Sequence, residues 1–181
     1  QYSNPTRKMS SGPWLTYFRF LNNITVPDKY PLPLIQQIFQ ELGSSCYFHA
    51  NDLLSGFCSV PCDQNSIPKT AVTTWWGLFE YTRTPQGVRN APAHFMRVIN
   101  KILSEKQLHS SNCAFVDDLT SHGYTLDESV LALRDVLAAL REKRMYISPA
   151  KLRWGYQSLE LLGHIISHKQ LECQPSKVTA I

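Results

Sequence analysis

The chain has 181 residues, 43% of them hydrophobic, which is enough for one packed domain or for one domain with a small lobe. No run approaches the roughly 18 apolar residues of a membrane span, and the polar stretch 1–11 lacks the apolar core of a signal peptide. The net charge of +4 permits a polyanionic partner without requiring one.

Five cysteines, an odd number, do not indicate a disulfide framework, so a reducing compartment is favoured. Cys46, Cys58 and Cys62 lie near His49, which raises the alternative of a zinc site. Their spacing matches no common zinc pattern, and the segment is typical of a strand, so zinc is disfavoured.

The first part of the chain predicts a strand, an extended crossing and a helix. The aromatic run 14–20 is typical of a strand, and the prolines within 27–33 indicate an extended crossing. Apolar residues follow helical spacing over 34–42, and Gly43 is a plausible stop. We expect this helix to pack in the core.

Residues 46–60 predict a strand that is interrupted at Ser55 and Gly56, with Asp52 in its middle. A carboxylate inside a mostly apolar strand is costly unless it is paired or bound to a metal. The alternative is a charge on the solvent-facing side of the strand. Residues 67–74 and 76–82 then predict a hairpin.

Residues 84–92 form a predicted loop, Thr-Pro-Gln-Gly-Val-Arg-Asn-Ala-Pro, which leads into a helix with apolar residues at helical spacing over 91–103. Backbone amides in a glycine loop before a helix can contact phosphate. The motif is weak by itself, and the alternative is a turn that only terminates a strand.

Two adjacent acids, Asp117 and Asp118, lie between residues 112–115 and 119–121, which read as two short strands with a tight turn. Adjacent carboxylates repel each other unless a cation lies there. Magnesium fits, because it prefers oxygen ligands. The alternative is a solvated Asp-Asp turn, which is common on protein surfaces.

The last part of the chain predicts a helix and a second hairpin. A capping box at 125–128 precedes a helix whose apolar face carries residues 126, 130, 133, 137 and 140. Cations cluster late in this helix, where they suit its dipole. A solvated face is the favoured interpretation of these charges, and the alternative is contact with nucleic acid. Residues 159–167 then predict a tight hairpin.

Three pieces occur in a fixed order: Asp52 in a strand, the Pro-Gln-Gly loop before a helix, and the Phe-Val-Asp-Asp hairpin. This order resembles the reverse transcriptases, in particular those of gypsy-class long-terminal-repeat retrotransposons and their retroviral relatives. Further matching stretches lie at 18–22, 30–33, 52–57, 90–95 and 161–164.

The resemblance implies an α+β right-hand polymerase fold, with an antiparallel palm sheet backed by helices, in one reverse transcriptase domain over 1–181. The fingers would comprise about 1–45 and 61–84. The palm would comprise about 46–60 and 85–181, ending at the primer grip region. A thumb would be absent from this stretch, and thumb, connection and RNase H regions are expected elsewhere in a parent polyprotein.

The implied activity is RNA-directed DNA polymerase, which adds deoxynucleotides to a primer 3′ end by a two-metal mechanism. Asp52 and Asp117 would bridge two Mg²⁺ ions, for which Mn²⁺ could substitute. The carbonyl of Leu53 would help to hold the triphosphate metal, and Asp118 would shape the site.

Further positions match other functional elements of the family. Phe57 matches the steric gate against a ribose 2′-hydroxyl, and Gln86 and Gly87 match the loop along the incoming nucleotide and the template. The primer grip is matched by Leu162, Gly163 and His164. The implied partners are an RNA or DNA template with primer and deoxynucleoside triphosphates, with no membrane, in the cytoplasm or within virus-like particles.

Two departures from the family pattern bear on the site. Asn51 replaces an apolar residue that is usual before the first acid, and it needs a hydrogen-bond partner if it is buried. Leu15 follows Trp14 where a basic residue commonly grips triphosphate, and Arg7 or Lys8 could substitute.

Two classes of function therefore stay open. The first is the polymerase, which the retention of all three acids favours. The second is a decayed or co-opted reverse-transcriptase-like module that binds nucleic acid or protein as a scaffold. A nuclease that uses the same metals is a distant third, because no nuclease motif is found.

Overall fold

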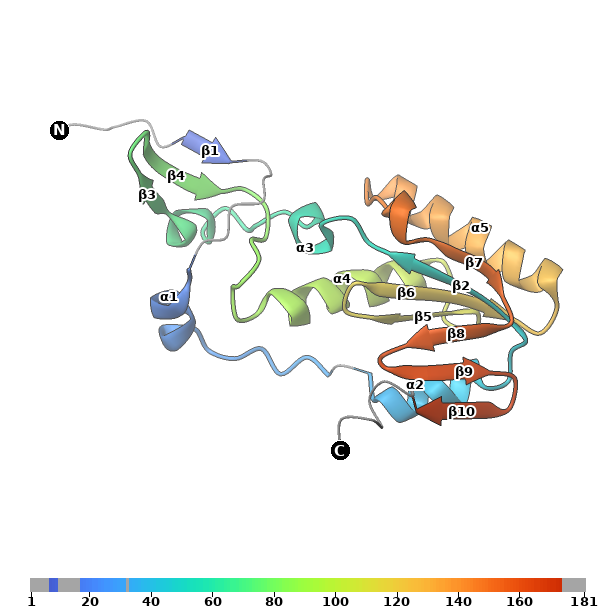
Figure 1. Ribbon diagram of the computed structural model, residues 1–181. Coiled ribbons are helices and arrows are strands. Elements are labelled where there is room, and N and C mark those ends of the chain that lie inside the picture. The colour runs from blue at the N-terminus through green and yellow to red at the C-terminus, as the bar shows by residue number, and fades with distance from the viewer. Residues whose placement is uncertain (1–6, 10–16, 32, 174–181) are drawn as a thin grey trace. The chain divides into compact units, whose positions relative to one another are not determined.

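The computed structural model describes residues 7–9, 17–31 and 33–173, which form helices and three small sheets (Figure 1). All strand pairs in these sheets are antiparallel except the parallel pair β1–β4. The described helices are α1 (Arg19–Ile24), α2 (Ile35–Leu42), α3 (Gly56–Ser59), α4 (Ala91–Glu105), α5 (Leu126–Glu142) and the short 3-10 helices η1 (Ile67–Thr70) and η2 (Pro149–Lys151). The described strands are β1 (Arg7–Met9), β2 (Tyr47–Asp52), β3 (Val72–Thr74), β4 (Gly77–Tyr81), β5 (Asn112–Phe115), β6 (Asp118–Gly123), β7 (Arg153–Tyr156), β8 (Ser158–Leu161), β9 (His164–Ser167) and β10 (Gln170–Cys173).

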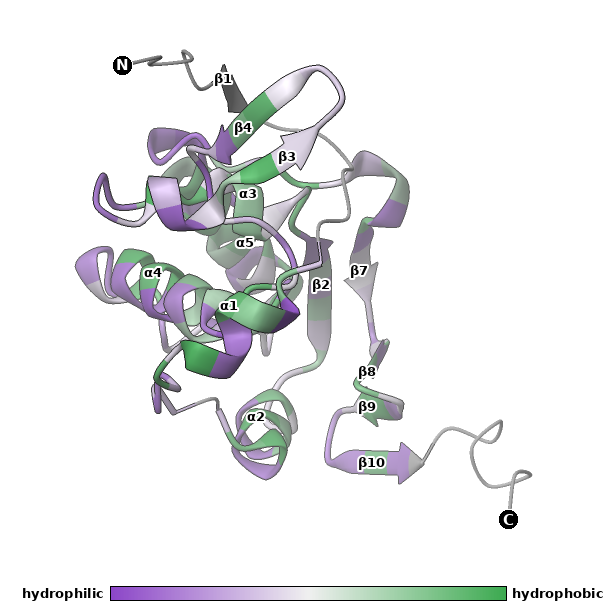
Figure 2. Cartoon of the chain, turned by 90° about the vertical axis from the view of Figure 1, so that its left-hand side faces the viewer, coloured by the Kyte–Doolittle hydropathy of each residue, from purple (hydrophilic) through white to green (hydrophobic). Residues whose placement is uncertain are grey.

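The chain forms two compact units. The first, called unit 1, comprises Gln1–Tyr30 and Ser55–Val98, and the second, unit 2, comprises Pro31–Leu54 and Ile99–Ile181. Helix α4 crosses the boundary. Its hydrophobic and hydrophilic residues alternate in bands (Figure 2), and Phe95, Met96 and Ile99 are among its buried side chains, as expected for a helix with one buried face.

Unit 2 is built on a four-stranded antiparallel sheet in the order β5-β6-β2-β7. Helix α5 contacts all four strands and lies along the sheet (Figure 1). A second antiparallel sheet has the order β10-β9-β8. Strands β8 and β9 are the hairpin predicted at 159–167, so that prediction is confirmed.

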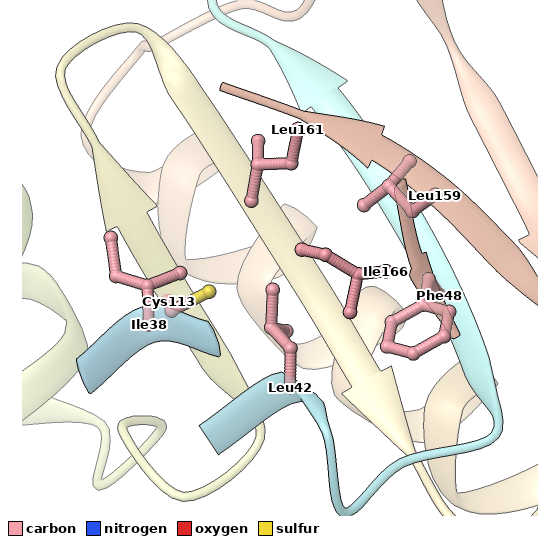
Figure 3. Close-up of a cluster of buried hydrophobic side chains, with 7 residues drawn as sticks. All are labelled: Ile38, Leu42, Phe48, Cys113, Leu159, Leu161 and Ile166. Atoms are coloured by element: carbon pink, nitrogen blue, oxygen red, sulfur yellow. The ribbon is translucent and has the colours of Figure 1, made fainter. Parts of the chain in front are cut away.

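A cluster of buried apolar side chains joins α2 to both sheets of unit 2 (Figure 3). Its members come from α2, β2, β5, β8 and β9, and they are Ile38, Leu42, Phe48, Cys113, Leu159, Leu161 and Ile166. The helix predicted over 34–42 therefore packs in the core, as expected, because its apolar residues recur at helical spacing.

Unit 1 holds a three-stranded sheet in the order β1-β4-β3. Strands β3 and β4 pair in antiparallel fashion with Thr74 opposite Gly77, which confirms the hairpin predicted within 67–82. Its first residues differ, because Ile67–Thr70 form η1 instead of a strand. Gly77 adopts a φ of 127° at the turn, a conformation that glycine reaches without a steric penalty.

Two predicted strands are wrong in part. Residues 19 and 20 belong to helix α1, and 14–16 lie outside the described residues. The strand predicted over 46–60 ends at Asp52, because Ser55 enters the left-handed region with a φ of 51° and opens the short helix α3. An apolar aromatic run does not distinguish a short helix from a strand.

The apolar face of α5 also differs from the prediction. Leu126 and Val130 are 48% and 47% exposed, whereas the buried set is Ser129, Ala132, Leu133, Val136, Ala139 and Leu140. Small residues on this face let the helix approach the sheet closely: a Cβ at Gly123 would lie 2.6 Å from the Ser129 backbone nitrogen. The predicted capping box is confirmed, with Thr125 and Glu128 bonding each other's backbone. Among the described residues, no helix is long and apolar enough to cross a bilayer.

Candidate active site

Three acids meet at one end of the main sheet of unit 2. Asp52, the last residue of β2, lies directly opposite Asp118, the first residue of β6. The backbone N–H of Leu53 donates a hydrogen bond to the carbonyl of Asp117 at 3.1 Å. The antiparallel pairing of β2 with β6 therefore brings Asp52 beside the Asp-Asp pair.

The turn between β5 and β6 positions Asp117. Phe115 pairs with Asp118, so Val116 and Asp117 form a two-residue connection, and the predicted tight hairpin is confirmed. Val116 has a φ of 52°, which is unusual for a β-branched residue. Strain of this kind persists only where the surrounding structure holds it in place, and it is concentrated at functional sites.

The carboxylate of Asp117 is poorly compensated. Burial, together with the Asp52 and Asp118 carboxylates, raises its pKa, and Lys151 offsets this rise only in part. Its Oδ1 atom is buried and has no hydrogen-bond partner among the described residues. An acceptor atom that is withdrawn from water without a donor is costly, so this oxygen is suited to a cation.

Asp118 lies in the same cluster of carboxylates. Partial desolvation and the nearby Asp52 carboxylate raise its pKa, while Lys151 and Arg153 act in the opposite direction. Repulsion between close carboxylates favours the protonated form unless a positive charge lies among them. The three acids therefore create a negative site that is stabilised by cations.

Lys151 supplies one such charge, and sequence reasoning missed it. Its Nζ atom donates to Oδ2 of Asp52 at 2.9 Å, and this bond with Asp52 raises the pKa of the lysine. Lys151 ends η2, just before β7, the strand that pairs with the other edge of β2. No local pattern could reveal the pair, because 99 positions separate the two residues.

A cavity of about 380 Å³ adjoins the acids within unit 2. Its lining includes Asp52, Asp118, Lys151, Arg153, Glu160 and Leu162. It thus joins two of the carboxylates to the first residue of the predicted primer grip. The cavity contains both signs of charge, which suits a polar occupant.

The fit of these residues to divalent cations is partial in this conformation. Among the described residues, no three His, Cys, Asp or Glu side chains form a group that could hold a metal ion. The ion pair with Lys151 occupies Asp52, while Asp117 Oδ1 is unpaired. Carboxylate oxygens are the ligands that Mg²⁺ prefers, so the donor chemistry fits, and Lys151 occupies one of the two Asp52 oxygens.

The predicted primer grip forms the turn between β8 and β9. Leu162 and Gly163 have φ values of 52° and 77°, the pair of positive angles typical of a tight two-residue hairpin turn. The ring of His164 lies 4.9 Å from that of Phe39 in α2, and Nδ1 of His164 lies 3.3 Å from the Leu162 carbonyl oxygen. The three residues therefore lie together.

The remaining predicted positions belong to unit 1. Phe57 lies in α3, half-buried, with its ring 5.3 Å from that of Phe95 in an edge-to-face arrangement. Gln86 and Gly87 are exposed in the loop before α4, where Gly87 has a φ of 88°. Both features are compatible with the predicted roles at a nucleotide site.

Asn51, the buried polar residue before the first acid, forms hydrogen bonds with its neighbours. Asn51 is 1% exposed, and its Oδ1 accepts a hydrogen bond from Trp154 Nε1 at 2.8 Å. Its Nδ2 donates to the Leu119 carbonyl at 3.3 Å. The departure from an apolar residue is therefore compensated by β7 and β6. The other departure, at Trp14 and Leu15, lies outside the described residues, as do the side chains of the substitutes at positions 7 and 8.

Comparison with known proteins agrees with the resemblance found in the sequence. Residues 8–166 match the family described as reverse transcriptase (RNA-dependent DNA polymerase). The retrovirus-related Pol polyprotein from transposon 297 of Drosophila melanogaster is 36% identical over 91% of this chain and 15% of its own length. That from transposon gypsy of the same organism is 32% identical over 99% of this chain and 17% of its own length.

Among solved structures, the fold is similar to that of the foamy viral protease-reverse transcriptase dRH in complex with double-stranded DNA. The TM-score is 0.80 and the identity 24%, over 91% of this chain and 29% of that chain. The chain thus spans less than a fifth of the length of the two transposon polyproteins. The family match covers most of the chain, and this chain therefore belongs to the reverse transcriptase family.

Proposed function

We propose that this chain is the fingers and palm of an RNA-directed DNA polymerase that extends a primer 3′ end with deoxynucleotides. The observation that carries the proposal is the meeting of Asp52, Asp117 and Asp118, with one buried Asp117 oxygen unpaired. Structural acids are normally satisfied by protein donors, whereas acids that await a cation are left exposed to one another.

The chain's own residues would act as follows. Asp52 and Asp117 would hold two divalent ions, Mg²⁺ or Mn²⁺, together with the Leu53 carbonyl, while Asp118 would add negative field. When bound, the two ions would stabilise the attacking and leaving oxygens of the transfer. Lys151 would release Asp52 as the ions enter.

The substrate would be positioned by the other predicted residues. Leu162, Gly163 and His164 would hold the primer 3′ end beside the cavity. Gln86 and Gly87 would lie along the incoming nucleoside triphosphate and the template, and Phe57 would contact its sugar. An RNA or DNA template with primer is the proposed partner, and the family name and the DNA-bound foamy viral structure support it.

The proposed borders follow the family pattern, with fingers at 1–45 and 61–84 and palm at 46–60 and 85–181. The compact units have other borders, at residues 30, 54 and 98. Because the transposon relatives are Pol polyproteins, we infer that other polymerase regions belong to a longer parent chain, within the cytoplasm or virus-like particles.

A second candidate is a co-opted module that binds nucleic acid or protein without catalysis. The ion pair between Lys151 and Asp52 favours it, because a permanent ion pair would keep this acid from a metal ion. The experiment that separates the two is extension of a DNA primer on an RNA template with and without Mg²⁺, using the full-length chain that carries this sequence. Extension that requires the metal supports the polymerase, and binding without extension at any metal concentration supports the module.

A further inference from the structure

The loop that carries Gln86 and Gly87 is fastened by the side chain of one residue of α1. Nδ2 of Asn22 donates to the Gly87 carbonyl at 2.7 Å. Oδ1 of the same amide accepts from the backbone N–H of Arg89 at 2.8 Å. Asn22 thus bonds the backbone on both sides of Val88, with a donor and an acceptor used at once.

Four further hydrogen bonds, made by the side chains of Arg89 and Asn90, extend this contact along the chain. The Arg89 guanidinium donates to the carbonyls of Asn22 and Thr25, at 3.2 and 3.3 Å. The side chain of Asn90 donates to the Val26 carbonyl at 2.8 Å and accepts from the Asp28 N–H at 3.0 Å. The loop 87–90 and the segment 22–28 are therefore joined at three loop positions, all of them within unit 1.

These bonds determine shape more than stability. Gly87 and Arg89 are exposed, and water could satisfy their backbone groups if Asn22 were absent. Exchanging such a bond for one with water changes stability little. The loop contains a glycine in the left-handed region, at a φ of 88°, and glycine has the largest conformational freedom of any residue. Hydrogen bonds from outside the loop therefore hold it in one conformation.

We propose that Asn22 is a positioning residue that presents Gln86 and Gly87 to the incoming deoxynucleoside triphosphate. This inference rests on the proposed function for the nature of the ligand. The amide is suited to the role because it offers a donor and an acceptor together, whereas Asp offers only acceptors and Ala neither.

The test combines hydrogen exchange with nucleotide kinetics on the full-length chain. Asn22→Ala removes both bonds, and Asn22→Asp keeps an acceptor for Arg89 while it removes the donor to Gly87. Asn23→Ala is the matched control, because Asn23 is the exposed neighbour on the same helix. Thermal unfolding of each variant shows whether it is folded, and Asn22→Asp carries the test if Asn22→Ala is not.

The expected result is faster exchange of the loop 86–90 in Asn22→Ala. The KM for the deoxynucleotide should rise by about threefold to tenfold in Asn22→Ala and Asn22→Asp, because the released loop would adopt the binding conformation only about a tenth to a third of the time. The value of kcat should change less than KM, and Asn23→Ala should match wild type in both.

Unchanged exchange in a folded Asn22→Ala would overturn the fastening itself. Faster exchange with an unchanged KM would overturn the positioning role. If the wild-type chain does not extend primers, the proposed function fails and the positioning role falls with it. The exchange data then still show, separately, whether Asn22 orders the loop.

Discussion

At the scale of single residues, the three acids Asp52, Asp117 and Asp118, which meet where β2 ends and β6 begins, are arranged at the expense of stability. Asp117 has a raised pKa and an unpaired buried oxygen, and Asp118 also has a raised pKa. Groups of this kind are usual where a protein must bind or transform a ligand, because a purely structural site would neutralise them.

Asp117→Asn should therefore stabilise the fold when no divalent ion is present. The amide removes the repulsion from Asp52 and Asp118, and the unfolding midpoint should rise by a few degrees, since about 1 kcal/mol shifts it by roughly 2–4 °C in a domain of this size. The measurement is thermal unfolding in EDTA. A lower midpoint for Asp117→Asn would show that the carboxylate has a structural partner.

The same difference should depend on pH in a defined direction. The folded-state pKa of Asp117 lies above its ordinary value of 3.8, so the folded state takes up this proton first as the pH falls. The advantage of Asp117→Asn over wild type should be full above the raised pKa and should vanish as the pH approaches 3.8. Urea unfolding of both proteins across this window checks the sign, and an advantage that grows towards low pH would contradict it.

Phe57 is the residue proposed to enforce the choice of sugar. Phe57→Ala should raise incorporation of ribonucleotides relative to deoxyribonucleotides, because the ring would no longer clash with a 2′-hydroxyl. Phe79→Ala, at another half-buried Phe of unit 1, is the matched control. If Phe57 only packs against Phe95, the substitution costs stability, by up to about 3–5 kcal/mol for a core Phe, and the incorporation ratio stays unchanged.

At the scale of elements, His49 joins β2 to β7 and to α5. It is 3% exposed; its Nδ1 accepts from the Gly155 N–H at 3.2 Å, and its Nε2 lies 3.1 Å from Ser129 Oγ. These partners assign the proton to Nε2 in a neutral ring. Burial lowers the pKa of His49 below the ordinary 6.5.

The packing of these elements should consequently weaken in mild acid. The unfolded state protonates His49 near its ordinary value of 6.5, whereas the folded state resists protonation, so stability falls as the pH drops from 6.5 towards the lowered pKa. His49→Gln should flatten this part of the stability profile, and His109→Gln, at an exposed histidine, should not. Equal slopes for wild type and His49→Gln in chemical unfolding would refute the coupling.

Much of the element order follows from local patterns in the sequence. The capping box at Thr125, the helical spacing of α2 and α4, and the turn at the two acids are local signals, and each element lies where it was predicted. Strand β7 was missed, because its four residues are exposed and show no alternation. Its place depends on pairing with β2, a contact between residues far apart in the chain.

Some residues of the candidate site could likewise be predicted from the sequence, and others could not. The sequence predicts Asp52, Asp117 and Asp118 through a resemblance that covers most of the chain, and the antiparallel register brings them together. Lys151 and the Trp154 that satisfies Asn51 carry no local signal. Their contacts with Asp52 and Asn51 can be recognised only in the folded structure, where β7 and η2 lie beside β2.

At the scale of the whole molecule, the predicted functional residues are shared between two compact units. The acids, the cavity and the primer grip belong to unit 2, while Phe57, Gln86 and Gly87 belong to unit 1. The proposed polymerase therefore needs both units, and a variant that unfolds either one should lose extension.

The net charge predicts how tightly residues 1–181 would bind the proposed primer–template duplex. A net charge of +4 supplies only modest attraction to phosphates, so binding should be weak and should fall as salt increases. Fluorescence anisotropy with a labelled duplex at about 50 and 200 mM salt measures the slope. Tight binding that is insensitive to salt would mean that contacts other than phosphate neutralisation dominate.

The central claim is that the three acids form a metal-dependent polymerase site, and single-nucleotide primer extension on an RNA template tests it most directly. Wild type, Asp117→Asn and the control Asp127→Asn, an exposed acid on α5, are compared in the full-length chain with Mg²⁺. The account predicts extension by wild type and Asp127→Asn, and none by a folded Asp117→Asn. Extension by Asp117→Asn at the wild-type rate would contradict it.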